Sequence, residues 1–360
     1  MFQKDDKNRC FYQPIRWIVE AANRLDSCMW TLLNSRCYSQ YKKNQSAVKS
    51  KPFHSKALIL LGILWIFSAA AASEGMSPAS GRIIVIDKAK KQLILYRNGR
   101  ATARSPISFG IDPNSDKYKA FDCATPEGRY VITYKKIESP FHRFLGISYP
   151  NRMNAEKALA SGIISKAEFE RVVENIRKSR WTACDTGLGC DIGIHGGGVF
   201  RSMDHSRERD WTEGCIALNN PDIEKLFDSC KPGDPVIIFN SSRNLYGIIR
   251  PFTHATELDA NGIPVCENGA FTYQTEMATS LGRMVLTLKE GKDYGRSIDV
   301  RVYGNGASEQ PSLVLVDRNA DGYMSSLDSV SGPDDLVKNP EAAYRMIREA
   351  VIAALSTGVF

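Results

Sequence analysis

The sequence predicts a mostly β protein with inserted helices, followed by a C-terminal region that mixes α and β structure. Short β-branched and aromatic runs separated by turn signals fill residues 82–136, and a charged stretch rich in Ala and Glu fills residues 153–180. The pattern changes again after about residue 241. A chain of 360 residues with 43% hydrophobic residues is long enough for two folded units with real cores.

The first half contains the clearest strand signals. Residues 82–110 read "RIIVIDKAKKQLILYRNGRATARSPISFG", in which Asn98-Gly99 separates two strand-like runs and predicts a tight hairpin. "TPEGRYVITYKK" (residues 125–136) predicts a turn followed by a strand. Residues 153–180 predict helices, and "GCDIGIHGGG" predicts a strand that ends in glycines.

A helix and a strand are expected before the second region begins. Asn220 as N-cap and Pro221 at the first helical position predict a helix that runs to about Ser229. "KPGDPVIIFN" predicts a turn and then a strand at Val236–Phe239. We therefore place a domain boundary near Ser241, with a first domain at 82–240 and a second at 241–360.

The second domain shows its own alternation of elements. Three strands are expected, at Met284–Leu288, Ser297–Tyr303 and Ser312–Val316. A final helix is expected from Asn339-Pro340, with one apolar face formed by Tyr344, Ile347, Val351 and Leu355.

The positive charge of the chain is confined to its N-terminus. Of 47 basic and 40 acidic residues, 11 and 4 lie in residues 1–56, so this stretch carries the whole net charge of +7. The rest of the chain is neutral, which argues against nucleic acid as a partner. Residues 1–56 are either a basic cytoplasmic leader or lie upstream of the true start codon.

An apolar segment follows this basic stretch. "ALILLGILWIFSAAAA" (residues 57–72) has no charge and ends in an Ala-x-Ala site at Ala70-Ala71-Ala72. Residues 57–73 are thus expected to be a signal peptide, or else an uncleaved anchor in the inner membrane. Both interpretations place the protein in the periplasm or cell envelope.

Six cysteines follow the apolar segment. In an exported protein, thiols usually pair, and "CDTGLGC" (residues 184–190) predicts a local disulfide whose glycines let the short loop turn. Pairs of CxxC type, which would indicate zinc, are absent. Cys215 is left open at this point as a disulfide partner, a buried core residue or a nucleophile.

His195 offers a base for that thiol. A thiol attacks a carbonyl well only as a thiolate, and a nearby imidazole can take its proton. The glycines at 196–198 allow backbone to approach a substrate closely, and Gly214 leaves the sulfur accessible. Backbone N–H groups at Gly214 and Cys215 are suited to stabilise an oxyanion. The alternative is a core histidine and an unrelated cysteine.

Three separated blocks, "TPEGRY", "IHGGG" and "WTEGCIAL", resemble the L,D-transpeptidase catalytic domain, also called the YkuD domain, over roughly Arg82 to Asn240. The resemblance implies a mostly β catalytic domain in the cell envelope, with Cys215 as nucleophile and His195 as its base. Gly196 matches the position whose backbone orients the imidazole. The remaining expected oxyanion and substrate-binding residues are Gly214, Thr212, Gly197 and Trp211.

The same resemblance implies a reaction on peptidoglycan tetrapeptide stems. The cysteine attacks the bond between the third residue and the terminal D-Ala, and an amine of a second stem resolves the acyl-enzyme into a cross-link. Attack by water instead gives L,D-carboxypeptidase activity. No cofactor is expected for catalysis.

Two positions depart from the commoner family pattern. Glu213 stands where His is usual, and Ala217 stands where Arg is usual. With "ISYPN" at residues 147–151, the motif is more similar to a YafK-like branch, which implies hydrolysis of peptidoglycan–protein linkages, with a wall-linked protein as partner, as an alternative. The helical stretch at 153–180 is either a lid over the cleft or a surface insertion.

A second motif, "DRNADGYMSSLD", lies in the C-terminal domain. Its positions match a calcium loop of EF-hand type, with Gly322 at the sharp turn and Ser325 at the ninth position. The expected ligands are Asp317, Asn319, Asp321, Tyr323 through its carbonyl, and Asp328. The alternative is an ordinary Asp/Asn/Gly turn, and a calcium ion here would be structural.

A function of a different class stays open beside the enzyme: a non-catalytic wall-binding module with a calcium-stabilised appendage. A papain-type peptidase is disfavoured because such enzymes place Cys before His along the chain. Here His195 precedes Cys215.

Overall fold

The computed structural model describes residues 81–179, 184–199, 210–291, 295–304 and 309–358. These residues belong to one compact unit that extends from Ser73 to Phe360. The expected leader at 1–56 and the apolar segment at 57–73 lie outside the described residues. Within the described part of the chain, no helix combines the length and apolarity needed to span a bilayer.

An eight-stranded sheet forms the first half of the structure. Its spatial order is β3-β2-β1-β8-β4-β5-β6-β7. The strands are β1 (Arg82–Asp87), β2 (Gln92–Arg97), β3 (Arg100–Pro106), β4 (Gly128–Ser139), β5 (His142–Ile147), β6 (Gly193–His195), β7 (Ile216–Ala217) and β8 (Pro235–Phe239).

The two central strands, β1 and β8, run parallel and are buried on both faces. Val85 pairs with Ile237 in the register. Ile84 and Ile86 belong to the core on one face of the sheet, whereas Ile83 and Val85 belong to a core shared with the C-terminal sheet. Burial on both faces explains why these strands read as continuous apolar runs.

The sheet curls until its two ends meet. The backbone N–H of Ser108, just beyond β3, donates to Ala217 O at 3.0 Å, and Ser108 O accepts from Ala217 N at 2.8 Å. The same two segments also bind each other through Thr212, whose N–H donates to Phe109 O at 3.0 Å and whose carbonyl accepts from Ile111 N at 3.0 Å. The segment that carries Cys215 is therefore held between β6 on one side and the chain after β3 on the other.

The hairpin expected at Asn98-Gly99 is confirmed, because these residues join β2 to β3 with φ values of 48° and 75°. Positive φ at both positions is the requirement of a type I′ turn. The helix expected from Asn220 is also confirmed, as α5 (Asn220–Ser229), but its N-cap is Asn219 and not Asn220. The prediction was off by one residue, because neither asparagine caps the helix with its side chain.

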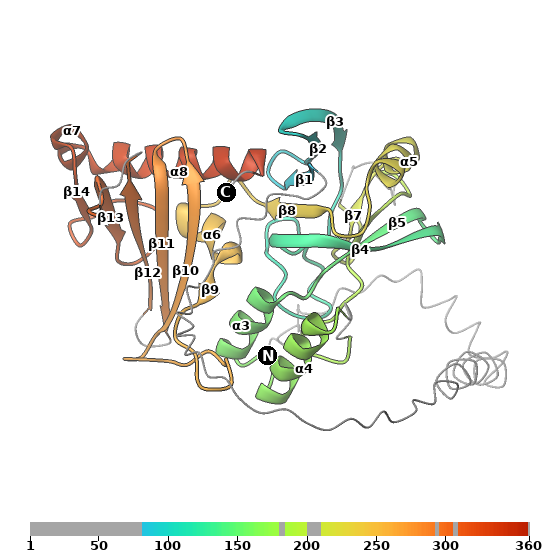
Figure 1. The fold of residues 1–360 in the computed structure, drawn as a ribbon, viewed down its shortest axis with the longest axis horizontal. Helices are drawn as coiled ribbons and strands as arrows, with labels where there is room; N and C mark the ends of the chain where they lie inside the picture. The colour runs from blue at the N-terminus through green and yellow to red at the C-terminus, as the bar shows by residue number, and fades with distance from the viewer. Residues whose placement is uncertain (1–80, 180–183, 200–209, 292–294, 305–308, 359–360) are drawn as a thin grey trace, which may run out of the picture. The chain divides into compact units, whose positions relative to one another are not determined.

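The stretch at 153–180 forms two helices, α3 (Arg152–Ala160) and α4 (Lys166–Arg177), which lie side by side (Figure 1). Helix α3 is fastened to the C-terminal region: Lys157 Nζ donates to Thr253 O at 2.7 Å, and Glu156 Oε2 accepts from Ala255 N at 2.9 Å. Both side chains are buried. These contacts favour a fixed insertion over a movable lid.

The C-terminal sheet has the order β14-β13-β12-β11-β10-β9. Its strands are β9 (His254–Ala255), β10 (Phe271–Thr279), β11 (Gly282–Gly291), β12 (Gly295–Tyr303), β13 (Leu313–Asp317) and β14 (Ser329–Ser331). Short helices α6 (Leu245–Ile249), η1 (Arg250–Phe252) and α7 (Asp334–Lys338) lie between strands or before α8 (Pro340–Thr357). Helix α8 runs across this sheet (Figure 1), with its expected apolar face, from Tyr344 to Leu355, in the shared core.

The described residues are thus mostly β, with inserted helices and a C-terminal α+β region, as the sequence predicts. The three expected C-terminal strands correspond to β11, β12 and β13, while β5, β7, β9, β10 and β14 had not been predicted. The boundary near Ser241 stays a prediction. Side chains of β1 and β8 pack with the C-terminal sheet in one core.

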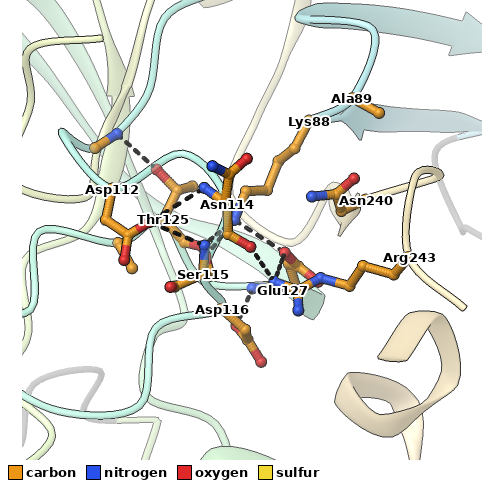
Figure 2. Close-up of polar contacts among 12 residues, drawn as sticks. Lys88, Ala89, Asp112, Asn114, Ser115, Asp116, Thr125, Glu127, Asn240 and Arg243 are labelled. Atoms are coloured by element: carbon orange, nitrogen blue, oxygen red, sulfur yellow. Dashed lines mark hydrogen bonds and ion pairs between the residues drawn. The ribbon is translucent and has the colours of Figure 1, made fainter. Parts of the chain in front are cut away.

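A buried polar network joins the two regions (Figure 2). The Lys88 ammonium donates to Glu127 Oε1 at 2.9 Å and to the carbonyl oxygens of Ser115 and Thr125 at 2.6 and 3.1 Å. Arg243, from beyond β8, donates to the same Oε1 at 3.0 Å. The Lys88 and Glu127 side chains are 0% and 1% exposed. Each charge of the pair therefore needs the other, because a buried charge without a partner is costly; Glu127 Oε2 and Arg243 Nε have no hydrogen-bond partner among the described residues.

We expect Lys88→Met to destabilise the protein by about 3 to 5 kcal/mol, because it leaves the Glu127 carboxylate buried with one partly exposed partner. Urea unfolding would measure this loss. The control is Lys90→Met, since Lys90 is 59% exposed and pairs with Asp87 at 3.3 Å; such a surface pair is worth at most about 1 kcal/mol. Equal effects of the two substitutions would contradict the role of the network.

Candidate functional site

Cys215 and His195 lie on two neighbouring parallel strands. In the register of β6 and β7, His195 pairs with Ala217 and Ile194 with Ile216. Cys215 immediately precedes β7, two residues before Ala217. Because residues two apart in a strand share a face, the thiol and the imidazole project to the same side of this edge.

Cys215 is a half-buried free thiol. Its S–H donates to Asp191 O at 3.7 Å. Burial raises the pKa of the thiol to about 11, and the nearby carboxylates of Asp191 and Glu213 add to this rise; an N–H donated by Gly193 and the charge of Lys117 act in the opposite direction. The thiol is therefore protonated at neutral pH and requires a base for attack.

His195 is buried and oriented by its own chain. Nδ1–H donates to Gly196 O at 2.7 Å, because a carbonyl oxygen only accepts. The neutral ring then keeps its acceptor lone pair at Nε2. Phe141 stacks on the ring at 4.6 Å between centroids, Phe144 lies parallel to it at 6.0 Å, and Trp211 meets it edge-on at 5.7 Å. These rings fix the plane of the imidazole.

The glycines of the motif serve packing within the protein. A Cβ at Gly196 would lie 2.7 Å from Asn220 Oδ1 and 2.8 Å from Phe141 O. A Cβ at Gly214, where φ is +126°, would lie 2.7 Å from Ala124 O. From their place in the sequence, these glycines were expected to let a substrate come close to the backbone and to the sulfur. The structure instead requires them because neighbouring backbone and side chains fill the space.

The other expected residues of the site gather around these two. Thr212 Oγ1 donates to Cys215 O at 2.7 Å and accepts from Gly214 N at 3.2 Å, so it closes the turn before the thiol. Gly197 N donates to Asn220 Oδ1 at 2.9 Å, and Trp211 Nε1 donates to Gly198 O at 3.1 Å. The N–H of Gly214 is thus already engaged within the turn.

Tyr134, Asp191 and Lys117 were not found by sequence reasoning. Burial raises the pKa of Tyr134 to about 12, and the nearby charge of Asp191 adds to this rise. Lys117 is a buried lysine paired with Asp122 at 2.7 Å. No local motif marks these residues, because they come from a strand and two loops that the fold brings to the thiol. The position of Asp191 directly after Cys190 was the one available signal.

The disulfide expected between Cys184 and Cys190 is confirmed. Its loop is docked on α4 and on the sheet: Gly187 N donates to Glu168 Oε1 at 3.0 Å, and Tyr149 O–H donates to Leu188 O at 3.1 Å. The loop leads directly into Asp191 and β6.

The acidic loop at 317–328 folds around its own backbone. Asp317 Oδ1 and Oδ2 accept from Ala320 N and Gly322 N at 2.6 and 3.2 Å. Asp328 Oδ2 accepts from Ser325 N and Oγ, each at 2.7 Å, and Asp321 Oδ1 accepts from Tyr323 N at 2.8 Å. Asn319 Nδ2 donates to Asp321 Oδ2 at 2.8 Å.

The carboxylates of this loop do not converge in this conformation. Among the described residues, one group of three possible metal ligands has its ligand atoms within 4.8 Å of one another: Cys184, Cys190 and Asp191. It lies outside this loop, and the two cysteine sulfurs in it form the disulfide. A calcium site at 317–328 thus stays a prediction and would need the acidic side chains to exchange N–H partners for the ion.

The raised pKa of Cys215 predicts strongly pH-dependent alkylation. In a Cys266→Ser background, which removes the exposed thiol, the iodoacetamide rate at Cys215 should rise about tenfold per pH unit from pH 7 to 9, because the thiolate fraction does. Mass spectrometry of the labelled protein would measure it. A rate that levels off near neutral pH would show instead a preformed thiolate.

Calcium binding at 317–328 predicts a higher melting temperature in Ca²⁺ than in EGTA. A ligand at 100 times its Kd stabilises the folded state by about 2.7 kcal/mol. Asp321→Asn, which keeps an acceptor for Tyr323 N but removes a charge, should abolish the gain. Identical melting curves in Ca²⁺ and EGTA would reject the site.

Comparison with known proteins agrees with the motif. Residues 81–238 match the family model YkuD, described as the L,D-transpeptidase catalytic domain. No curated protein matches the sequence.

Several solved structures are similar at low identity. An L,D-transpeptidase from Xylanimonas cellulosilytica is 16% identical, with a TM-score of 0.27, over 44% of this chain and 61% of that one. The Enterococcus faecium L,D-transpeptidase C442S mutant is 15% identical, with a TM-score of 0.26, over 44% and 50%. Mycobacterium tuberculosis L,D-transpeptidase 1 is 14% identical, with a TM-score of 0.25, over 44% and 62%.

The match spans only half to about 60% of the length of these proteins. The assignment rests on the family model, whose limits enclose the eight-stranded sheet up to β8 and contain both Cys215 and His195. Residues 81–238 of this chain are thus similar to the YkuD family of L,D-transpeptidase catalytic domains.

Proposed function

We propose that the protein is a cysteine L,D-transpeptidase of the cell envelope that acts on peptidoglycan tetrapeptide stems. The observation that carries the proposal is the placement of a free thiol, Cys215, directly before β7, beside the strand β6 that ends at the oriented imidazole of His195. Export to the periplasm or cell envelope is part of the proposal and rests on the apolar segment at 57–72.

The geometry supports general-base activation of the thiol. With Nδ1–H bound to Gly196 O, Nε2 of His195 is the ring atom that can accept a proton. In the proposed reaction, the Cys215 proton moves to Nε2 as sulfur attacks the carbonyl carbon between the third residue and D-Ala. The imidazolium then returns the proton to the departing D-Ala amine, which leaves a thioester.

The developing oxyanion needs a hydrogen-bond donor. Since Gly214 N–H donates to Thr212 Oγ1, the proposal assigns the backbone N–H of Cys215 to this task. Thr212 supports it indirectly, because its hydroxyl holds the Cys215 carbonyl.

The thioester is resolved by an amine or by water. Resolution by an amine of a second stem gives a cross-link, and resolution by water gives L,D-carboxypeptidase activity. Hydrolysis of peptidoglycan–protein linkages is the other alternative, favoured by the YafK-like features Glu213 and Ala217 and implying a wall-linked protein as partner.

The direct test incubates the protein with tetrapeptide muropeptides and analyses the products by mass spectrometry. We expect cross-linked dimers from the wild type, none from Cys215→Ala, and a rate about 100-fold lower or less from His195→Gln, because proton transfer by a positioned base contributes at least about that factor. Cys266→Ser is the matched control at an exposed thiol and should keep full activity.

The products separate the alternatives. Tripeptides and free D-Ala without dimers would assign the protein as a carboxypeptidase. Equal, background-level turnover by the wild type and Cys215→Ala would reject catalysis on these stems and favour a non-catalytic wall-binding module.

A further inference from the structure

The electrostatic surroundings of Cys215 are unusual for a nucleophilic thiol. Two carboxylates, Asp191 and Glu213, are close enough to disfavour the thiolate, and both residues are exposed. The nearby cation, Lys117, is buried and already paired with Asp122 at 2.7 Å. The exposed charged groups next to the sulfur, Asp191 and Glu213, are therefore both negative.

Asp191 is held firmly at this position. Its backbone carbonyl accepts the S–H of Cys215 at 3.7 Å, and the charge of its side chain adds to the raised pKa of Tyr134. The disulfide between Cys184 and Cys190 closes the loop directly before it. The Tyr134 ring is itself wedged against Gly146, where a Cβ would lie 2.4 Å from the ring. Asp191 is thus a fixed feature of the thiol's environment.

Neither carboxylate has a cation as partner. The ion pairs between described side chains include neither Asp191 nor Glu213. The negative charge beside the sulfur opposes formation of the thiolate. The same charge attracts a cation that approaches the thiol.

We propose that Asp191 is a specificity-determining residue that directs a protonated amine, and not water, to the acyl group on Cys215. The inference rests on the proposed function and adds the residue that selects the amine acceptor, which arrives as an ammonium ion, over water. Asp191 binds the ammonium through a charge-assisted hydrogen bond, and Glu213 adds to the local potential.

The transfer step balances without a further reagent. The bound ammonium releases one proton to solvent and becomes an amine. Its nitrogen forms a C–N bond to the thioester carbon as the C–S bond breaks, and the second proton passes through His195 to the departing sulfur. The products are an amide and the Cys215 thiol, with one proton released to solvent.

The key variant is Asp191→Asn. Asp191 has φ of 59°, and asparagine tolerates this left-handed conformation well. The substitution therefore removes the charge and keeps the backbone carbonyl that contacts the thiol. Asp228→Asn, at an exposed carboxylate on α5, is the matched control.

The experiment uses the full chain with a tetrapeptide stem as acyl donor. Two acceptors compete with water: the amide of Nα-acetyl-lysine, whose amine is protonated at pH 7.5, and hydroxylamine, which is neutral there. Mass spectrometry measures acyl-enzyme formation and the ratio of transfer to hydrolysis.

For Asp191→Asn we expect transfer to the lysine amine to fall about tenfold relative to hydrolysis, the size of a lost hydrogen bond to a charged group. Acylation should be as fast as in the wild type or faster, and transfer to hydroxylamine should be unchanged. Asp191→Glu, which keeps the charge, should retain the preference for lysine. Added salt should weaken transfer to lysine in the wild type and not in Asp191→Asn.

The outcomes separate the two proposals. No acyl-enzyme in the wild type overturns the proposed function. A normal acyl-enzyme with the same transfer ratios in the wild type, Asp191→Asn and Asp228→Asn overturns the role of Asp191 alone. An equal loss of transfer to both acceptors also overturns it, because that result indicates a structural effect and not recognition of charge.

Discussion

The parallel pairing of β1 with β8 is the constraint on which the rest of the structure depends. These two strands are neighbours inside the eight-stranded sheet, and their side chains alternate between two cores: Ile84 and Ile86 enter the core on one face of that sheet, and Ile83 and Val85 enter the core shared with the C-terminal sheet. Every apolar residue of β1 therefore packs in one of the two cores. The Lys88–Glu127–Arg243 network lies at the end of β1 and pairs opposite charges buried at the same junction.

The curl of the sheet then determines the site. Because Ser108 binds Ala217, the chain after β3 passes beside the cysteine turn, and Ala124 lies against Gly214. The turn is thus enclosed by protein on several sides, which removes water from the sulfur and keeps the thiol neutral. A neutral thiol next to an oriented imidazole suits a nucleophile that is activated only when a substrate is bound.

The sequence was sufficient to predict the features that depend on residues close together in the chain. The Asn98-Gly99 turn, the apolar face of α8 and the glycines of the disulfide loop each depend on neighbouring residues, and each was predicted. Strands β5 and β10 were not predicted, because "HRFLGI" is short and "FTYQTEMAT" buries few side chains. Their pairing comes from neighbouring strands and not from their own apolar pattern. The cap of α5 was misplaced because Asn219 and Asn220 bind the backbone of Val199 and Gly197 instead.

By itself, the sequence determined the order of most elements, the cysteine and histidine of the site and the chemistry that these side chains allow. Residue type and short-range spacing carry that information. Only the tertiary structure decided that Asp191, Tyr134 and Lys117 surround the thiol, that Gly196 and Gly214 serve packing, and that Thr212 closes the turn. These facts depend on contacts between segments far apart in the chain, and the contacts exist only after β6, β7 and the disulfide loop have come together.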